Sequence, residues 1–395
     1  MSDLVLVLNV GSSSIKFALF DSDPLPIPRK PEWSGKVEGI RTAQTTYVDS
    51  SLDAAQELAL TGDHPSLAAL ACIRDRVLAR LDGRKLKAVA HRVVHGGMRY
   101  FAPTRVDAQV LADLRNYIPL APLHQPFALE AISALLDSNP DVVQVACFDT
   151  AFHRTLPTVE RMLPLPHSAW QRGVRRYGFH GLSYEYQAIA LAERHGERAR
   201  GRTIVAHLGS GASLCGMLHL ESVATTMGFS ALDGLMMGTR CGALDPGALL
   251  YLMEIEKLSL ERVAQILYHE SGLLGVSGVS ADPRVLLAQE ADNEQVRDAL
   301  ALYVRRIVRE IGAMAAALGG LDLLAFTAGI GENNPIIRER ICRDLGFLDV
   351  EIDTTANAVN SATISRATSR VLVAVEPTNE EWIAAVRAEE LVGRS

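Results

Sequence analysis

Residues 4–20 read LVLVLNVGSSSIKFALF: an apolar run, a short polar turn and a second apolar run. The first run has the length of a strand and is rich in branched side chains, and only Lys16 interrupts the second run. This pattern predicts two strands that are joined by a tight turn.

The turn at residues 9–14 has the chemistry of a phosphate loop. Gly11 can adopt a positive φ at little cost, and successive backbone N–H groups with three serine hydroxyls can surround anionic oxygens. Lys16 adds a positive charge, and Asn9 offers a neutral oxygen to a metal ion. The turn is not a Walker A loop, because GxxxxGKS or GxxxxGKT is absent and an apolar strand follows. An ordinary glycine- and serine-rich hairpin is the alternative.

A second copy of this pattern lies about half a chain further on, where residues 203–218 read TIVAHLGSGASLCGML. Aligning the two stretches gives four pairs of matching positions: Asn9 with His207, Gly11 with Gly209, Ser12 with Ser210, and Lys16 with Leu214. The repetition predicts two related halves, each with a phosphate loop, that hold a nucleotide between them.

The composition is that of a globular protein with sizeable cores, since 48% of the residues are hydrophobic and 22% are charged. A formal net charge of −7 argues against nonspecific binding to nucleic acid. The N-terminus lacks the basic segment of a secretory signal, and glycines and an aspartate interrupt the long apolar stretch at 313–330, so we expect no membrane span. Five scattered cysteines without CxxC spacing fit a reducing cytoplasm.

The order of predicted elements is a hairpin followed by βα units, which indicates an α/β fold with a mixed sheet flanked by helices. Arg92 lies in the strand predicted at residues 87–94. A guanidinium can bind a carboxylate through two hydrogen bonds, so Arg92 could hold an acidic substrate, or a nearby acid as the alternative. Asp149 follows the apolar run VVQVACF at the carboxyl end of a predicted buried strand. Asp149 could hold Mg²⁺ through water, or cap the turn that follows.

Two loops carry further polar candidates. His180 lies between glycines in the loop RRYGFHG, where it could donate to a phosphoryl oxygen, and Ser183 is predicted to cap a helix over residues 184–195. Arg240 lies within residues 225–247, the longest stretch without clear periodicity. Loops of this length inside compact domains are usually functional.

Two features near the C-terminus complete the pattern. Residues 329–333, GIGEN, are predicted to form a turn between a buried strand and a helix that opens at Pro335, which suits nucleotide contacts. Thr378 and Glu381 have the spacing of a capping box for the final helix, which leaves Glu380 available for another role.

The sequence resembles the acetate kinase family over essentially its whole length. Eight stretches carry the resemblance, in the family's order: LNVGSSSIKF (8–17), HRVVHGG (91–97), CFDTAFH (147–153), YGFHGLS (177–183), AHLGSGAS (206–213), MGTRCGALDPG (237–247), GIGEN (329–333) and PTNEE (377–381). The resemblance implies the fold shared by acetate and sugar kinases, actin and the heat-shock chaperones. That fold has two RNase-H-like (actin-like ATPase) domains with mixed sheets flanked by helices around a nucleotide cleft.

On this resemblance we expect an N-terminal domain over residues 1–150, completed by a C-terminal helix at about 380–395, and a nucleotide-binding domain over residues 151–379. The implied activity is the reversible, Mg²⁺-dependent transfer of the γ-phosphoryl group of ATP to acetate, giving acetyl phosphate and ADP by direct in-line transfer. Mn²⁺ is an alternative metal. The resemblance also implies a cytoplasmic homodimer.

Family roles carry over to matching positions of this sequence. The implied catalytic residues are Asp149, His180 and Arg240. The implied substrate-binding residues are Arg92, Val94, Leu123, Phe179 and Ala231. The implied metal-linked residues are Asn9 and Glu380. The implied nucleotide-binding residues are Ser12, Lys16, His207, Leu208, Gly209, Ser210, Gly211, Asp282, Pro283, Arg284, Gly329, Ile330, Gly331, Glu332 and Asn333.

These roles are chemically consistent with one another. A simple carboxylic acid has a pKa near that of a glutamate side chain, about 4.3, so the nucleophile is already ionised at pH 7 and needs no general base. The difficulty is to bring this anion to an anionic phosphate. Catalysis should therefore depend on alignment and on the positive charges of Arg92, Arg240 and Mg²⁺.

Two positions depart from the family pattern. Ser210 replaces a common asparagine in the second phosphate loop, and Ala231 replaces a common proline near the substrate pocket. A smaller residue at 231 could admit a longer acyl chain, and one methylene changes discrimination by only about 1–3 kcal/mol. A propionate or short-chain fatty acid kinase is therefore the first alternative.

Two other classes remain open at this point. A nucleotide-switched chaperone or filament protein shares the fold, but the chain ends at Ser395, just after the closing helix, and so leaves no room for a peptide-binding domain. A sugar kinase would need a base that deprotonates a hydroxyl, and Asp149 would then be essential.

Overall fold

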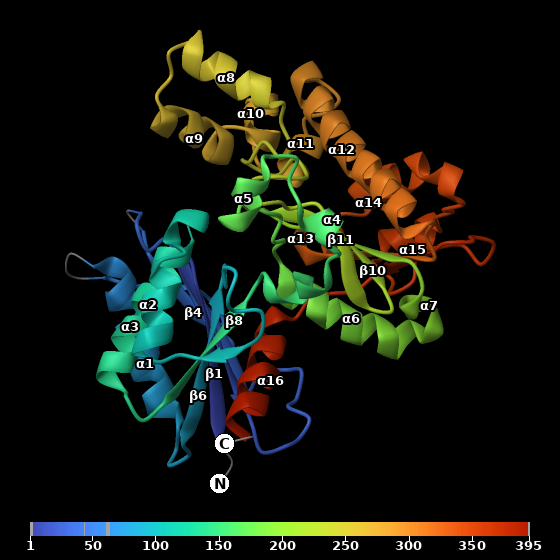
Figure 1. The fold of residues 1–395 in the computed structure, drawn as a ribbon. Coiled ribbons are helices and arrows are strands. Elements are labelled where there is room, and N and C mark those ends of the chain that lie inside the picture. Colours follow the sequence, from blue (N-terminus) through green and yellow to red (C-terminus); the bar gives the residue numbers. More distant parts are fainter. Residues whose placement is uncertain (1–2, 43, 61–63, 123, 394–395) are drawn as a thin grey trace. The chain divides into compact units, whose positions relative to one another are not determined.

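The computed structural model describes residues 3–42, 44–60, 64–122 and 124–393. The chain divides into two compact units, here called unit 1 (Met1–Ala151 with Asn379–Ser395) and unit 2 (Phe152–Thr378). Each unit is built around one mixed β-sheet (Figure 1).

The sheet of unit 1 has the strand order β5-β4-β3-β2-β1-β6-β8-β7. β1, β6 and β8 run parallel to one another, and the remaining pairs are antiparallel. The strands are β1 (Leu4–Val10), β2 (Ser14–Asp21), β3 (Trp33–Glu38), β4 (Thr46–Asp49), β5 (Gln56–Glu57), β6 (Leu86–Val93), β7 (Thr104–Arg105) and β8 (Val143–Phe148).

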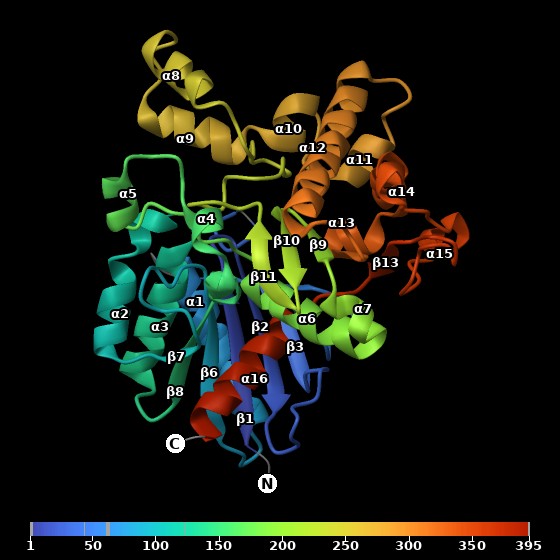
Figure 2. The same cartoon turned by 45° about the vertical axis from the view of Figure 1, so that its right-hand side comes forward.

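Helices cover both faces of the centre of this sheet, with α16 on one face and α1 and α3 on the other (Figure 2). β1 is therefore buried on both sides, which explains why LVLVLNV is a continuous apolar run rather than an alternating one. The helices are α1 (Pro65–Arg80), α2 (Ala108–Arg115), the 3₁₀ turn η1 (Ile118–Leu120), α3 (Gln125–Ser138) and α16 (Glu380–Gly393).

The C-terminal helix α16 is part of unit 1 although it lies more than 200 residues from the other elements of that unit. The Trp382 indole N–H donates to the Ile27 carbonyl at 2.8 Å, and the Asn379 amide donates to the Arg29 carbonyl at 2.8 Å. Asn379 also caps the helix, since its side-chain oxygen accepts the Trp382 backbone N–H at 3.0 Å. The predicted capping box of Thr378 and Glu381 is therefore wrong, and the Thr378 hydroxyl instead donates to a serine of unit 2.

The sheet of unit 2 has the strand order β11-β10-β9-β12-β13. Its antiparallel β9–β10–β11 and parallel β9–β12–β13 repeat the arrangement of β1–β2–β3 and β1–β6–β8 in unit 1. The predicted α/β fold with two mixed sheets is confirmed. The strands are β9 (Thr203–Leu208), β10 (Ala212–Leu218), β11 (Glu221–Thr225), β12 (Leu323–Thr327) and β13 (Leu372–Val375).

The two hairpins differ in the length of their turns. Val10 pairs with Ile15 across residues 11–14, whereas Leu208 pairs with Ala212 across residues 209–211, so the second turn is one residue shorter. Asn9 then lies opposite Lys16, and its counterpart His207 lies opposite Ser213. The predicted match of Lys16 with Leu214 is therefore wrong by one residue, and side-chain alternation makes that difference a change of face.

Helices surround the sheet of unit 2, and the longest of them, α12, is capped by Asn293, whose side chain accepts the Val296 N–H at 3.2 Å. Within the described ranges, no helix is both long and apolar enough to cross a bilayer. The helices are η2 (Ala151–Thr155), α4 (Thr158–Arg161), α5 (His167–Gln171), α6 (Gly181–His195), α7 (Glu197–Arg200), α8 (Pro246–Glu254), α9 (Leu260–His269), α10 (Gly272–Ser277), α11 (Pro283–Leu287), α12 (Glu294–Leu318), α13 (Ala328–Asn333), α14 (Pro335–Asp344), η3 (Gly346–Leu348) and α15 (Thr354–Ala358).

Two local predictions in unit 2 are wrong. GIGEN forms the short helix α13 directly after β12, rather than a turn. Helix α6 begins at Gly181 with His180 in the cap position, where His180 adopts the left-handed conformation with φ of 59°. Ser183, the predicted cap, lies inside this helix and is fully buried.

Candidate functional site

Three charged side chains of unit 1 meet where β6 and β8 end and α16 begins. The Arg92 guanidinium donates to both oxygens of Asp149, with Nε–Oδ1 at 2.9 Å and Nη2–Oδ2 at 2.8 Å. Its Nη1 donates to Glu380 Oε2 at 2.7 Å. One guanidinium is thus shared by two carboxylates whose side chains are only 4% and 13% exposed.

The cluster has more negative than positive charge, since one guanidinium faces two carboxylates. Burial opposes the charged form of Arg92, but the charges of Asp149 and Glu380 outweigh it and raise the pKa of Arg92 above its usual range. Burial, together with the neighbouring charges of Asp149 and Glu381, raises the pKa of Glu380 to about 7, although Arg92 and Lys16 act against this rise. A further cation would stabilise both carboxylates in their charged forms.

The oxygen donors of the cluster fit Mg²⁺. Mg²⁺ usually takes one or two carboxylates and keeps waters or substrate phosphates as its other ligands. Asp149 and Glu380 supply two carboxylates, and Asn9 lies at the end of the neighbouring strand β1. Among the described residues no group of three or more His, Cys, Asp and Glu forms a cage made of protein alone.

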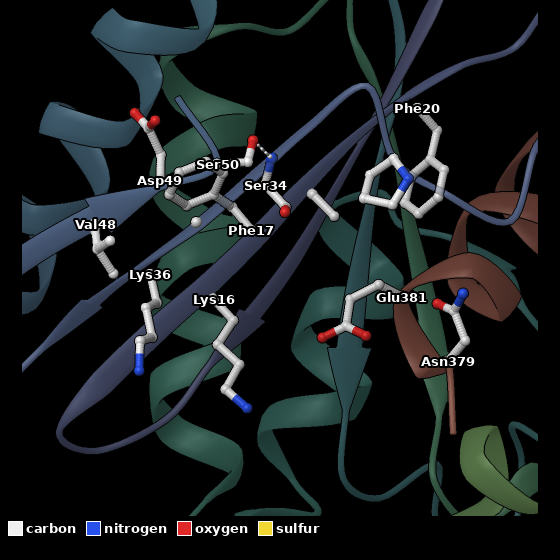
Figure 3. Close-up of a pocket in the computed structure, with 13 residues that line it drawn as sticks. Lys16, Phe17, Phe20, Ser34, Lys36, Val48, Asp49, Ser50, Asn379 and Glu381 are labelled. Carbon is white, nitrogen blue, oxygen red and sulfur yellow. Dashed lines mark hydrogen bonds between the residues drawn. The ribbon is translucent and has the colours of Figure 1, made fainter. Parts of the chain in front are cut away.

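A groove of about 400 Å³ is lined by residues of β2, β3, β4 and the beginning of α16 (Figure 3). Lys16 from β2 and Glu381 from the first turn of α16 both line it, together with Lys36 and Asn379. Glu381 had been given only a capping role by its spacing, and it is the carboxylate that sequence reasoning missed in unit 1.

The other predicted residues of unit 1 are placed as follows. Ser12 is exposed in the β1–β2 turn, and Val94 is half-buried directly after β6. Leu123 lies outside the described residues.

In unit 2 the turn between β9 and β10, His180 and Arg240 converge at Gly211. A Cβ on Gly211 would lie 2.6 Å from Arg240 Nη2 and 3.3 Å from His180 Nε2. A Cβ on Gly209 would lie 3.9 Å from His207 Nε2. Glycines at these positions therefore bring the loop backbone close to three nitrogen-bearing side chains, which is the geometry of an anion site.

Arg240 is a guanidinium without an acidic partner. Its Nη1 donates to the Ala231 carbonyl at 2.6 Å, and none of the ion pairs among the described residues includes it. Burial lowers the pKa of Arg240 from its ordinary value, with a small opposing effect of Tyr268. Arg92 pairs with two carboxylates, whereas none of the residues that the structure describes neutralises Arg240.

The two histidines beside the loop are stacked, with 4.1 Å between their ring centroids and 19° between their planes. His180 Nδ1 lies 2.8 Å from Ser213 Oγ, and His207 Nδ1 lies 2.8 Å from Ser183 Oγ. The sequence predicted only a capping role for Ser183 and gave no role to Ser213. The signal for Ser213 was the shorter turn, which places it opposite His207 on the same face of the hairpin.

The remaining nucleotide candidates lie on three elements. Leu208 is buried at the end of β9, and Ser210 is exposed in the loop after it. Asp282 caps α11 by accepting the Arg284 backbone N–H at 2.9 Å, and Arg284 is exposed. Pro283 is buried in the first turn of α11.

In α13 the Glu332 carboxylate serves the backbone. It accepts the N–H groups of Ala328 at 2.7 Å and Thr378 at 3.0 Å. Arg338 holds the other end of this helix, since its Nη1 donates to the carbonyls of Gly331 and Glu332 at 2.8 and 2.9 Å. Gly329 has open space where a side chain would lie. Ile330 and Asn333 complete the helix.

Two mixed sheets of the same topology, flanked by helices, place the chain in the class of actin-like ATPase folds. Within that class the chain belongs to the acetokinase family, whose model matches residues 4–386.

Individual relatives agree with this assignment. The acetate kinase of Rhodopseudomonas palustris (strain TIE-1) is 47% identical over 389 residues, which is 98% of this chain and 97% of that protein. The crystal structure of Porphyromonas gingivalis acetate kinase shares 35% identity with a TM-score of 0.85, over 99% of this chain and 100% of that one. A propionate kinase from Francisella tularensis shares 31% identity with a TM-score of 0.91, over 98% and 99% of the two chains.

Proposed function

We propose that this chain is an ATP:acetate phosphotransferase, which transfers the γ-phosphoryl group of ATP to acetate and runs reversibly. The observation that carries the proposal is the Arg240 guanidinium, which lies against Gly211 in the β9–β10 turn and has no acidic partner among the residues that the structure describes. Membership of the acetokinase family supports it. We propose that Arg92 of unit 1 binds the carboxylate of the acid, that the Arg92–Asp149–Glu380 cluster binds the metal, and that the β9–β10 turn and Arg240 of unit 2 bind the phosphates of the nucleotide.

The chemistry asked of the residues is charge neutralisation rather than proton transfer. Acetate is ionised at pH 7, so its carboxylate attacks the γ-phosphorus directly, a P–O bond to it forms, and the bond to the leaving ADP oxygen breaks. Mg²⁺, when bound at Asn9, Asp149 and Glu380, would neutralise phosphate oxygens. The carboxylates are then engaged elsewhere, and the Arg92 N–H groups can turn to the acetate carboxylate.

Asp149 is better suited to binding than to acting as a base. Both of its oxygens accept hydrogen bonds from Arg92, so neither is directed at a substrate hydroxyl. This contact also argues against a sugar kinase, in which an aspartate would remove a proton from a hydroxyl.

The direct test is the trapping of the product. Purified protein with ATP, Mg²⁺, acetate and hydroxylamine should give acetyl hydroxamate, because hydroxylamine reacts with an acyl phosphate. Omission of ATP and replacement of acetate by glucose are the controls. The proposal is overturned if acetate, propionate and butyrate all give no hydroxamate while the protein is folded.

A propionate kinase is the second candidate, and Ala231 is the observation that favours it. A methyl group stands where the family often has a proline, and the relative from Francisella tularensis is a propionate kinase. The Ala231 carbonyl also accepts a hydrogen bond from Arg240, so a change at residue 231 can affect phosphoryl transfer as well as acyl selectivity.

Ala231→Pro should therefore move selectivity toward acetate. Proline keeps the carbonyl that Arg240 needs and fills space beside it, so kcat/KM for propionate relative to acetate should fall about 5- to 10-fold. Steady-state kinetics with acetate, propionate and butyrate measure this ratio. Ala231→Gly is the companion variant, because it removes the methyl group at the same position. An unchanged ratio in both variants would show that residue 231 does not limit the acyl chain.

We also propose a homodimer in the cytoplasm. Helix α8 has no buried residue, and the apolar side chains of Leu250, Ile255 and Leu260 on and after it are 58%, 63% and 65% exposed. Apolar side chains gathered in this way usually mark an interface. Sedimentation velocity with and without ATP distinguishes a dimer from a monomer and from a nucleotide-dependent filament.

A further inference from the structure

Two hydroxyl relays reach the stacked histidines of unit 2. In the first, the Tyr184 hydroxyl contacts Ser213 Oγ, which contacts His180 Nδ1. In the second, the Thr378 hydroxyl donates to Ser183 Oγ at 2.9 Å, and Ser183 Oγ contacts His207 Nδ1. Tyr184, Ser213 and Ser183 have no exposed surface, so each hydroxyl finds its partners within the protein.

We propose that these two relays fix His180 and His207 as neutral imidazoles that carry their proton on Nε2 and donate it toward the phosphate loop. Tyr184, Ser213, Ser183 and Thr378 are then positioning residues for phosphoryl transfer. This inference rests on the proposed function for its catalytic meaning, but the tautomer that it states does not.

The direction of the relays follows from the chemistry of the hydroxyls. A serine hydroxyl has one proton, so a serine that accepts from another hydroxyl keeps its own proton for a second partner. Thr378 donates to Ser183, which leaves the Ser183 proton for His207 Nδ1. A phenol is a stronger acid than an alcohol, so Tyr184 donates to Ser213, whose proton then goes to His180 Nδ1.

The geometry shows where the Nε2 protons point. The nearest loop positions are Gly211 for His180 Nε2 and Gly209 for His207 Nε2, at 3.3 and 3.9 Å from the sites where a Cβ would stand. Both Nε2 atoms therefore lie beside the same short loop, on rings that stack with 4.1 Å between their centroids. Two neutral donors beside Arg240 can bind phosphoryl oxygens without adding repulsion between stacked cations.

Unit 2 contains an internal standard for this arrangement. His153 Nε2 lies 2.9 Å from the Phe179 carbonyl, which can only accept, and its Nδ1 lies 2.8 Å from Ser222 Oγ. Burial lowers the pKa of His153 to about 4, so the ring is neutral at pH 7 with its proton on Nε2. We propose the same arrangement for His180 and His207: a serine hydroxyl donates to Nδ1, and Nε2–H donates to an oxygen of the bound phosphate.

The tautomers can be measured without any substrate. Protein labelled with ¹⁵N-histidine should show His180 and His207, assigned from His180→Gln and His207→Gln spectra, protonated on Nε2 at pH 8 like His153. Tyr184→Phe keeps the ring but removes the donor, and Ser213→Ala removes the relay, so both variants should increase the Nδ1–H form of His180. Thr203→Val, which removes a buried hydroxyl at the other end of β9, should leave the His180 signals unchanged.

The kinetic arm separates positioning from folding. Tyr184→Phe should lower kcat about 3- to 10-fold and Ser213→Ala about 10-fold, with the KM for ATP and for the acid changed less than 2-fold. Ser213→Thr restores the hydroxyl and should recover kcat.

Protonation of His180 on Nδ1 in the unaltered protein, or an unchanged His180 tautomer in both variants, would overturn the inference. If the tautomer shifts as expected but no acid is phosphorylated, the proposed function fails and the relay stands.

Discussion

Arg240→Ala should lower kcat by a factor on the order of 10³ and leave the KM for acetate nearly unchanged. Arg240 lies against Gly211 in the turn that we propose binds phosphate, and in the described part of the chain no carboxylate pairs with it. A guanidinium in this position stabilises charge that develops on the transferring phosphoryl group, and removal of such a group costs 10³ to 10⁵ in other phosphotransferases. The acid is expected to bind through Arg92, so the KM for the acid should depend on Arg92 rather than on Arg240.

The variant should remain folded, which makes the kinetic loss interpretable. Removing Arg240 takes away one hydrogen bond to the Ala231 carbonyl and leaves no carboxylate without its counter-charge. Arg240→Lys keeps the charge but loses the planar fork, and it should recover only part of the rate. Arg262→Ala, which breaks an exposed pair with Glu270 in the same unit, is the matched control. A wild-type kcat in Arg240→Ala, or a change in KM alone, would contradict the assignment.

Arg92→Ala should be strongly destabilising as well as impaired in acid binding. The substitution leaves the carboxylates of Asp149 and Glu380 buried beside each other without their shared cation. Breaking a buried ion pair in this way costs about 3–5 kcal/mol. For a unit of this size the midpoint of thermal unfolding should fall by roughly 6–20 °C. The KM for acetate should rise more than kcat falls.

Magnesium gives this prediction its specific signature. Because a divalent cation can replace the missing positive charge, Mg²⁺ should raise the unfolding temperature of Arg92→Ala more than that of the unaltered protein. Arg84→Ala is the control. Arg84 forms a similar two-bond pair with Glu32, but the Glu32 side chain is 42% exposed and can be solvated once the pair is lost, so the substitution should cost at most about 1 kcal/mol. Equal unfolding temperatures for Arg92→Ala and Arg84→Ala would show that the cluster does not depend on its guanidinium.

The sequence predicts the fold well because the deciding signals are local. The run at residues 4–8 is apolar without alternation because helices cover both faces of β1, and the same signal marks β9 and β12. The position of Asp149 after a buried strand favoured a functional role, whereas Arg92 in its strand could hold either a substrate or a nearby acid. In the structure Arg92 binds a nearby acid, Asp149, at the carboxyl ends of β6 and β8.

The contacts that sequence reasoning missed depend on tertiary structure. Glu380 lies 288 residues from Arg92 along the chain, and no local pattern indicates that the two share a site. Ser213 lies opposite His207 because the second turn is one residue shorter than the first, and an ungapped alignment of the two stretches does not reveal this difference. Glu332 resembles a ligand-binding acid in its motif, yet its carboxylate holds the backbone of Ala328 and Thr378.

Thr378, the last residue of unit 2, makes two hydrogen bonds within that unit. Its N–H donates to Glu332 on α13, and its hydroxyl donates to Ser183, which contacts His207. One of the places where the polypeptide passes from unit to unit is therefore anchored to two segments that face the proposed nucleotide site. A ligand that restricts the motion of those segments would also restrict the motion of Thr378. By thermodynamic reciprocity, restricting the motion of Thr378 would then raise the affinity for that ligand. Nucleotide affinity and the mobility of the chain at Thr378 would then be linked by a single coupling free energy.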